Sequence, residues 1–172
     1  EVGYYRLEKI HADHQAYLAK KENDTSQKSI LIAAGWQDEN ILDTCADELI
    51  ISLLKEGFKV VFRPHPMTIT HKPELLDMLE EKFTQEKDFE LDTETVSEKY
   101  LHSADVMICD WSGVAIEYAF GTERPVLFIN TTCKIHNPHY KELDLEPIEF
   151  TLRNKIGKSI NLEDVSGIVQ IL

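Results

Sequence analysis

The sequence lacks the features that define several large functional classes. No apolar run approaches the roughly 20 residues that a membrane-spanning helix needs, and no signal-peptide pattern opens the chain. The three cysteines lie far apart with no CxxC pair. This spacing argues against a disulfide framework and favours reduced thiols in a cytoplasmic protein, with Cys45 and Cys109 in the core.

Positive charge is also scarce. The chain has 18 Lys and Arg against 31 Asp and Glu, a net charge of −13 at pH 7. This balance argues against a nucleic-acid backbone as the main partner and against broad attachment to anionic lipid. A small anionic ligand remains compatible with it, because a local cluster of Arg, His and backbone N–H groups can overcome the global field.

Three well-known ligand motifs are missing as well. The chain has no GxGxxG, no Walker A sequence and no nucleophile elbow, which disfavours the dinucleotide, P-loop and α/β-hydrolase classes. Two His-x-x-His pairs occur, His11/His14 and His136/His139. Neither has a further carboxylate or cysteine at ligand spacing, so we predict no metal site.

Short apolar runs alternate with helical periodicities along the chain. Buried strands are predicted at residues 29–34, 58–62, 89–91 (near a sheet edge), 106–109 and 126–129. Helices are predicted at residues 10–20, 41–56, 73–87, 97–103 (capped by Ser97), 114–120 and 162–172, with a short extended piece at 150–152. This order is typical of an α/β fold with a doubly wound, Rossmann-like parallel sheet.

The chain opens without methionine on a mixed polar segment. We therefore expect residues 1–27 to be an arm and linker from a preceding domain. Residues 28–172 are expected to form the folded domain, a length sufficient for a sizeable core.

Three loops should meet at the carboxyl edge of such a sheet, where ligands collect: residues 35–40, 63–66 and 110–113. Prolines on both sides of His65 predict that Arg63 and His65 lie on a stiff loop outside both sheet and helix. The loops bring a set of polar and aromatic side chains to one crevice: Trp36, Arg63, His65, Asp110 and Ser112.

These residue types suit a diphosphate. Arg63 can fork onto phosphate oxygens, and His65 can hydrogen-bond or protonate one. Gly113 lets the backbone N–H groups of the next helix approach the anion, and Ser112 adds a hydroxyl. Glu117 lies about one turn into that helix, on the side that could reach a ribose hydroxyl.

Each assignment has a structural alternative. Arg63 can pair with one of the many carboxylates, and His65 can cap a helix. Ser112 can be a plain helix N-cap. The other two candidates can be a solvated carboxylate and a core aromatic residue: Glu117 and Trp36.

Two segments together resemble a known family. Residues 104–113, Ala-Asp-Val-Met-Ile-Cys-Asp-Trp-Ser-Gly, and Arg-Pro-His-Pro at residues 63–66 resemble the C-terminal half of CDP-glycerol glycerophosphotransferases of the teichoic-acid polymerase type. That family has an Ala-Asp-x-x-Ile-x-Asp-Tyr-Ser-Ser segment and an Arg-x-His-Pro loop. The resemblance covers most of residues 3–130, with departures at Gln37, Trp111 and Gly113.

The resemblance implies one half of a GT-B fold, the donor-nucleotide domain, with the acceptor-binding domain missing. Glycerol phosphate would move from a CDP-alcohol to an acceptor hydroxyl, with no metal and no cofactor beyond the donor. The implied catalytic residues are His65 and Arg63. The implied donor-binding residues are Ser112, Gly113, Asp110, Glu117 and Trp36.

The resemblance also implies a polymer or lipid-linked acceptor, cell-surface polymer synthesis, and a cytoplasmic protein that associates peripherally with the inner membrane face. Two alternatives stay open. The turn also resembles UDP-sugar GT-B enzymes and UDP-N-acetylglucosamine 2-epimerases. The changes at Gln37 and Gly113 also suit a non-catalytic nucleotide-binding module.

Overall fold

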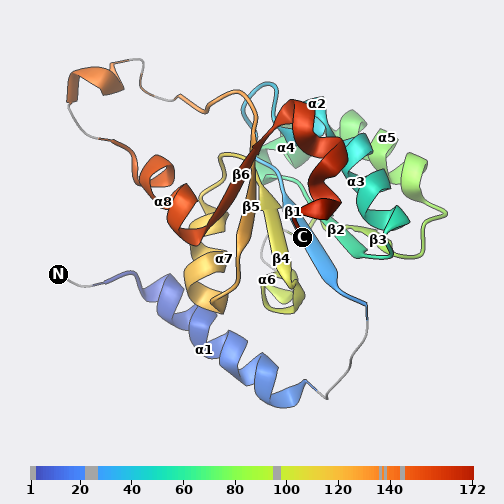
Figure 1. Ribbon diagram of the computed structural model, residues 1–172, viewed down its shortest axis with the longest axis horizontal. Coiled ribbons are helices and arrows are strands. Elements are labelled where there is room, and N and C mark those ends of the chain that lie inside the picture. The colour runs from blue at the N-terminus through green and yellow to red at the C-terminus, as the bar shows by residue number, and fades with distance from the viewer. Residues whose placement is uncertain (1–2, 22–26, 95–97, 136, 138, 144–145) are drawn as a thin grey trace.

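A single six-stranded sheet forms the centre of the protein (Figure 1). The computed structural model describes residues 3–21, 27–94, 98–135, 137, 139–143 and 146–172. The strand order is β3-β2-β1-β4-β5-β6, and every neighbouring pair is parallel. The strands are β1 (Ser29–Ala33), β2 (Lys59–Arg63), β3 (Phe89–Leu91), β4 (Val106–Cys109), β5 (Val126–Asn130) and β6 (Gly157–Asn161).

Helices cover both faces of the sheet, which confirms the doubly wound α/β fold. The α-helices are α1 (Tyr5–Lys20), α2 (Ile41–Thr44), α3 (Ala46–Lys55), α4 (Pro66–His71), α5 (Pro73–Phe83), α6 (Lys99–Ser103), α7 (Val114–Thr122) and α8 (Ile148–Ile156). Two 3₁₀ helices, η1 (Tyr140–Leu143) and η2 (Leu162–Gln170), complete the described elements.

The central strand β1 shows why the sheet needs two helical layers. Ile30 and Ile32 point into a core shared with α3, α5 and η2, whereas Leu31 and Ala33 point into a core shared with α6 and α7. Each of the four side chains is at most 3% exposed. A strand with apolar residues on both faces must be buried on both, which is the property that predicted it from sequence.

Several predicted helix boundaries differ from those in the structure. The helix expected at residues 41–56 is two helices, because Cys45 leaves helical geometry (φ −139°, ψ 6°) while keeping the apolar spacing. The helix expected at residues 73–87 is α5, which ends at Phe83. The predicted cap Ser97 lies outside the described residues, and α6 begins after Glu98.

The C-terminal region departs further from the prediction. Residues 150–152 lie inside α8 and are not extended, and β6 was not predicted at all. β6 is an edge strand in which Ile160 alone is buried, so its sequence lacks the apolar run of the central strands. Residues 162–172 contain a helix, as expected, but of the 3₁₀ type. The placement of residues 89–91 at the other edge, as β3, is confirmed.

Helix α1 begins at Tyr5, earlier than predicted, and lies along α7 on the outside of one helical layer (Figure 1). Ile10 is fully buried, and α7 offers Gly121 at the crossing, where a Cβ would overlap the Ile10 side chain. Glycine therefore permits the close approach of the two helices. Whether residues 1–27 lead from a further domain stays a prediction.

The predictions about the cysteines and about membrane-spanning helices can be compared with the structure directly. Cys45 and Cys109 are free and buried, which confirms them as core thiols, and burial raises the pKa of Cys45 to about 11. Across the described ranges, no helix is both long and apolar enough to cross a membrane.

A buried histidine pair joins α1 to α6 and makes stability depend on pH. The rings of His14 and His102 stack with centroids 5.9 Å apart, and His14 is 1% exposed. Burial, followed by the positive charge of Arg124, lowers the pKa of His14 from 6.5 to about 4. The unfolded chain therefore binds a proton more readily than the folded chain between these two values.

We expect the folded state to lose up to about 3 kcal/mol as pH falls from 6.5 to 4, because each unit of pKa shift is worth about 1.4 kcal/mol. Urea unfolding followed by circular dichroism at pH 7, 5.5 and 4.5 measures this loss. The variant His14→Phe keeps a ring in the stack but cannot be protonated, so it should lose less stability than the parent. Equal losses in both proteins would assign the acid sensitivity to other groups.

Candidate functional site

A cavity of about 400 Å³ opens at the carboxyl ends of β1, β2 and β4. Five of the seven candidate residues line it: Arg63, His65, Ser112, Gly113 and Glu117. The remaining wall comes from the ends of β1 and β3 and the residues that follow them, from α4, α6 and the start of α7, and from Arg6 of α1. The parallel sheet thus brings the two family-like segments together, as the sequence predicted. Asp110 and Trp36 are not among the lining residues.

Arg63 is the last residue of β2, paired with Ala33 of β1, and so lies in the sheet and not in a loop. Its Nε lies 2.8 Å from Asp92 Oδ2, an ion pair without the alignment of a hydrogen bond, and its Nη2 donates to the carbonyl of Glu94 at 3.2 Å. The carboxylate pairing considered as the alternative for Arg63 is therefore present. A direct role toward a diphosphate stays a prediction.

His65 is the N-cap of α4, between Pro64 and the first helical residue, Pro66. Its Nδ1 accepts a hydrogen bond from the backbone N–H of Met67 at 3.1 Å. Pro66 occupies the first helical position, where its missing N–H is not needed, so the prediction that these prolines exclude a helix is wrong. The capping alternative for His65 is confirmed, and the cap uses one ring nitrogen.

The cap also determines what the His65 ring can offer a ligand. Because Nδ1 accepts, the neutral ring carries its proton on Nε2. Burial, and then the nearby charge of Lys134, lowers the pKa of His65, so the neutral form prevails at pH 7. At that pH the ring has one N–H donor, at Nε2, and His65 is among the residues that line the cavity.

The turn before α7 brings hydrogen-bond donors to the same cavity. Gly113 is the N-cap of α7, and no side chain caps the helix, so the proposal that Ser112 is a plain N-cap is wrong. A Cβ built on Gly113 would meet nothing within 4 Å. An uncapped helix start with open space before it suits an anion, because its first N–H groups need partners.

Asp110 organises the floor of the site without lining the cavity. It is 1% exposed and accepts hydrogen bonds from the backbone N–H groups of Gly35 (2.7 Å), Ile41 (3.2 Å) and Trp111 (2.7 Å). Gln37 adds a side-chain hydrogen bond at 3.2 Å. Burial raises the pKa of Asp110 despite these bonds. The hydrogen bonds of Asp110 connect the loop after β1 to the turn after β4. Donor binding by Asp110 stays a prediction.

Trp36 lies at the rim and is 37% exposed, which argues against the core alternative. Its ring centroid is 6.0 Å from that of His65, and Lys134 Nζ lies 5.7 Å from the Trp36 ring. The indole therefore stands next to a cavity residue, and its role in base stacking stays a prediction.

Glu117 is held by the N-terminal segment. Its carboxylate accepts from the Tyr4 hydroxyl at 2.7 Å and from Arg6 Nε at 2.9 Å. The Glu117 side chain is 17% exposed, so it is not the freely solvated carboxylate considered as the alternative. Arg6 lies within the range that resembles the family, but the sequence analysis assigned it no role in the site.

Arg153 was missed altogether. It is 6% exposed and lies between two aromatic rings, with its guanidinium carbon 4.0 Å from the Trp111 ring centroid and 4.4 Å from that of Phe128. It donates to the Asp110 carbonyl at 2.7 Å and to Asn130 Oδ1 at 2.8 Å. Arg153 thereby attaches α8 to the turn before α7. No spacing pattern in the sequence marks it.

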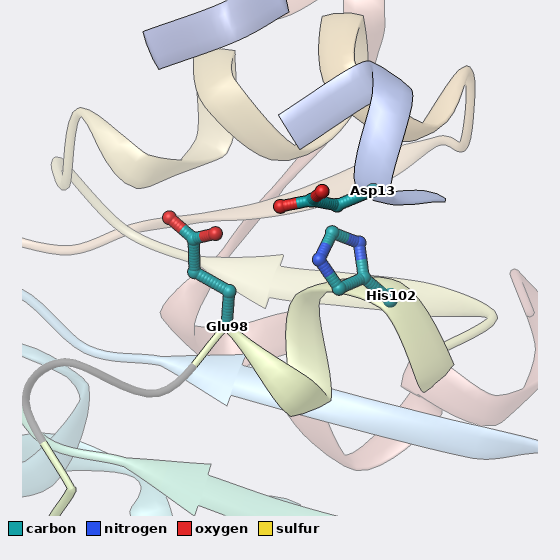
Figure 2. A group of neighbouring side chains, drawn as sticks. All are labelled: Asp13, Glu98 and His102. Atoms are coloured by element: carbon teal, nitrogen blue, oxygen red, sulfur yellow. The ribbon is translucent and has the colours of Figure 1, made fainter. Parts of the chain in front are cut away.

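One group of possible metal ligands occurs in the described ranges: Asp13, Glu98 and His102, whose ligand atoms lie within 4.8 Å of one another (Figure 2). Lys9 Nζ is 2.6 Å from Asp13 Oδ2 and 2.9 Å from Glu98 Oε2. The ammonium group of Lys9 therefore already contacts both carboxylates, and the guanidinium of Arg6 pairs with Glu98 as well, so we assign no metal to them.

The fold of the chain is similar to those of several solved structures. It matches Methanocaldococcus jannaschii UDP-GlcNAc 2-epimerase (TM-score 0.59, 16% identity, 99% of this chain and 46% of the other). It matches Escherichia coli heptosyltransferase WaaC with ADP (TM-score 0.58, 14% identity, 93% and 48%). It also matches an H548A variant of the wall teichoic acid polymerase TagF (TM-score 0.53, 16% identity, 99% and 42%).

These similarities show the fold alone, and the chain spans less than half the length of each of these structures. No curated protein sequence matches the chain significantly. Residues 1–151, however, match the sequence family described as CDP-Glycerol:Poly(glycerophosphate) glycerophosphotransferase. This match includes both segments that line the cavity, so the chain belongs to the CDP-glycerol glycerophosphotransferase family and has the fold of one half of a GT-B enzyme.

Proposed function

We propose that this chain binds the nucleotide donor of a transferase that moves glycerol phosphate, or a related polyol phosphate, from a CDP-alcohol to an acceptor hydroxyl. The observation that most supports this proposal is that residues of both family-like segments, 63–66 and 104–113, line one cavity at the carboxyl edge of the sheet, together with Val114 and Glu117 of α7. Membership of the glycerophosphotransferase family supports this donor.

Charge in the cavity suggests how the donor is oriented. The acidic lining residues outnumber the two arginines and are Asp92, Glu94, Glu98 and Glu117. Both arginines are engaged by these carboxylates: Arg63 with Asp92, and Arg6 with Glu98 and Glu117. The diphosphate is therefore better placed at His65 and the start of α7, and the carboxylates suit nucleoside hydroxyl and amino groups.

In the proposed reaction, an acceptor oxygen attacks the phosphorus of the glycerol phosphate. The bond from that phosphorus to the bridging oxygen breaks, and CMP leaves with the negative charge. His65 Nε2–H and the N–H groups at the start of α7 stabilise this charge as it develops. Because His65 acts as a donor in this step, a different group must act as the base that takes the proton of the acceptor hydroxyl.

The acceptor site belongs to the other half of the GT-B fold in this proposal, with residues 1–27 leading from that half. The acceptor is then a growing polymer or a lipid-linked unit in teichoic-acid or other cell-surface polymer synthesis. The protein would work in the cytoplasm, at the inner membrane face, and this chain alone would bind donor without turnover.

Isothermal titration with CDP-glycerol, CDP, CMP and UDP-N-acetylglucosamine tests the donor. We expect CDP-glycerol and CDP to bind at least about tenfold more tightly than the UDP-sugar, a difference of about 1.4 kcal/mol. Tighter binding of the UDP-sugar would instead support the epimerase-like or UDP-sugar transferase function. If the complete protein binds these nucleotides but transfers no glycerol phosphate, the chain is a non-catalytic nucleotide-binding module.

A matched pair of glycine variants locates the binding site in the same titration. Gly113→Ala adds a methyl group in the open space before α7, and Gly167→Ala adds one in open space on η2, away from the cavity. Neither glycine has a positive φ, so both variants should fold. Gly113→Ala alone should weaken CDP binding. Equal affinities in the two variants would move the diphosphate away from Gly113.

A further inference from the structure

The carboxylate of Glu117 is reached from a segment 113 residues away in the sequence. The Tyr4 hydroxyl donates to Glu117 Oε1 at 2.7 Å. Arg6 Nε lies 2.9 Å from both Oε1 and Oε2. Because Glu117 lies in the first turn of α7 and lines the cavity, these contacts connect the N-terminal segment to the candidate donor site.

Two further contacts hold Arg6 in this position. Arg6 Nη1 is 3.3 Å from Glu98 Oε1, so the guanidinium bridges the start of α6 and the start of α7. The rest of α1 is anchored on α7 through the fully buried Ile10, opposite Gly121. The hydrogen bond that Arg6 donates to Glu117 raises the pKa of Arg6, which therefore stays charged throughout the working range of pH.

The contacts to Glu117 leave capacity for a ligand. A carboxylate has about four lone-pair sites. Among the contacts of the described residues, Oε1 accepts from both Tyr4 and Arg6, whereas Oε2 accepts from Arg6 only. One position on Oε2 is thus available for a donor in the cavity, and the direction of that position is set by the two N-terminal residues.

We propose that Tyr4 and Arg6 are positioning residues that orient Glu117 to accept a hydrogen bond from a ribose hydroxyl of the donor. The N-terminal segment is then part of the donor site and not only a linker. This inference rests on the proposed function. A glutamate fixed before binding does not lose its rotamer freedom when the ligand arrives, which is a gain in affinity without any direct contact from Arg6.

A purely structural role is the competing explanation, because Arg6 also connects α1 to α6 and α7. The two explanations differ in which ligands they affect. If Arg6 acts through Glu117, its loss should matter only for ligands with ribose hydroxyls. If Arg6 merely holds the fold, its loss should affect every nucleotide alike.

The test compares CDP with 2′,3′-dideoxy-CDP by calorimetric titration of the 172-residue chain. We expect Arg6→Ala to weaken CDP binding by about five- to tenfold, in line with the cost of immobilising one flexible side chain, and to leave dideoxy-CDP within about twofold. Arg6→Lys keeps the charge but loses the paired contact, so it should restore CDP affinity only in part. Tyr4→Phe should show a smaller loss of the same kind, specific to CDP.

Lys9→Ala is the matched control, because Lys9 shares Glu98 with Arg6 but makes no contact with Glu117. It should bind CDP like the parent. Thermal unfolding of each variant checks the fold. If Arg6→Ala does not fold, Tyr4→Phe decides the question, since its hydroxyl lies on an exposed residue outside α1.

The outcomes separate the inference from the function on which it rests. A parent chain that does not bind CDP overturns the proposed function and with it the inference. A parent that binds CDP and dideoxy-CDP equally removes Glu117 from the ribose. A parent that prefers CDP, with that preference unchanged in Arg6→Ala and Tyr4→Phe, overturns the inference alone, as does an equal loss of both ligands.

Discussion

Replacing Asp110 with alanine is expected to lower the free energy of unfolding by about 3–6 kcal/mol. Each buried N–H left without a partner costs about 1–3 kcal/mol, and the removal of an unfavourably buried carboxylate offsets part of the total for three such groups. Three backbone N–H groups would lose their acceptor: those of Gly35, Ile41 and Trp111. All three come from segments that build the floor of the site. The loss should be measured by urea unfolding at pH 7.

Asp110→Asn and Asp38→Ala complete this experiment. The asparagine keeps one acceptor oxygen, and its neutral amide avoids the cost of burying a charged carboxylate, so its cost should be clearly smaller than that of alanine. The Asp38 side chain is fully exposed in the loop after β1, so Asp38→Ala should be nearly neutral. A change below about 1 kcal/mol for Asp110→Ala would mean that other acceptors replace the carboxylate.

Replacing His65 with alanine should have the largest effect on chemistry. In the complete transferase, we expect transfer of glycerol phosphate to fall by about 10²–10³-fold, the usual effect of removing one donor that stabilises developing charge. The rate of CMP release measures it. The same variant of this chain should still fold, because the loss of the α4 cap costs only about 1 kcal/mol.

The two nitrogens of His65 can be tested separately. His65→Asn keeps a side chain that caps α4 but lacks a donor at the place of Nε2, so it should fold like the parent and still fail in transfer. His71→Ala removes an exposed histidine at the other end of the same helix and should leave transfer unchanged. Normal turnover in His65→Asn would limit His65 to a capping role.

The fold was predictable because the central strands carry a strong local pattern. Residues 29–34, 106–109 and 126–129 read as strands buried on both faces, and they are β1, β4 and β5. Such strands require helices on both sides, which determines the layer architecture. β6 escaped prediction because an edge strand with one buried residue has no such pattern.

The cavity residues were predictable for a related reason. Parallel strands place their carboxyl ends at one edge, so the segments around Arg63, His65 and Ser112 had to approach each other once the sheet was parallel. Their functional assignment came from resemblance to a family. The match over residues 1–151 confirms the family. The donor-binding and catalytic roles of individual residues stay predictions.

The amino-acid sequence by itself determined that the sheet is parallel, which family the chain belongs to, and which two segments meet at the cavity. These properties depend on local periodicity and short motifs. Only the tertiary structure decided which side chains support them. Asp110 beneath the turn, Arg153 between two rings and Arg6 on Glu117 all act across long stretches of chain. Contacts of this kind follow from three-dimensional packing, which leaves no spacing pattern along the chain.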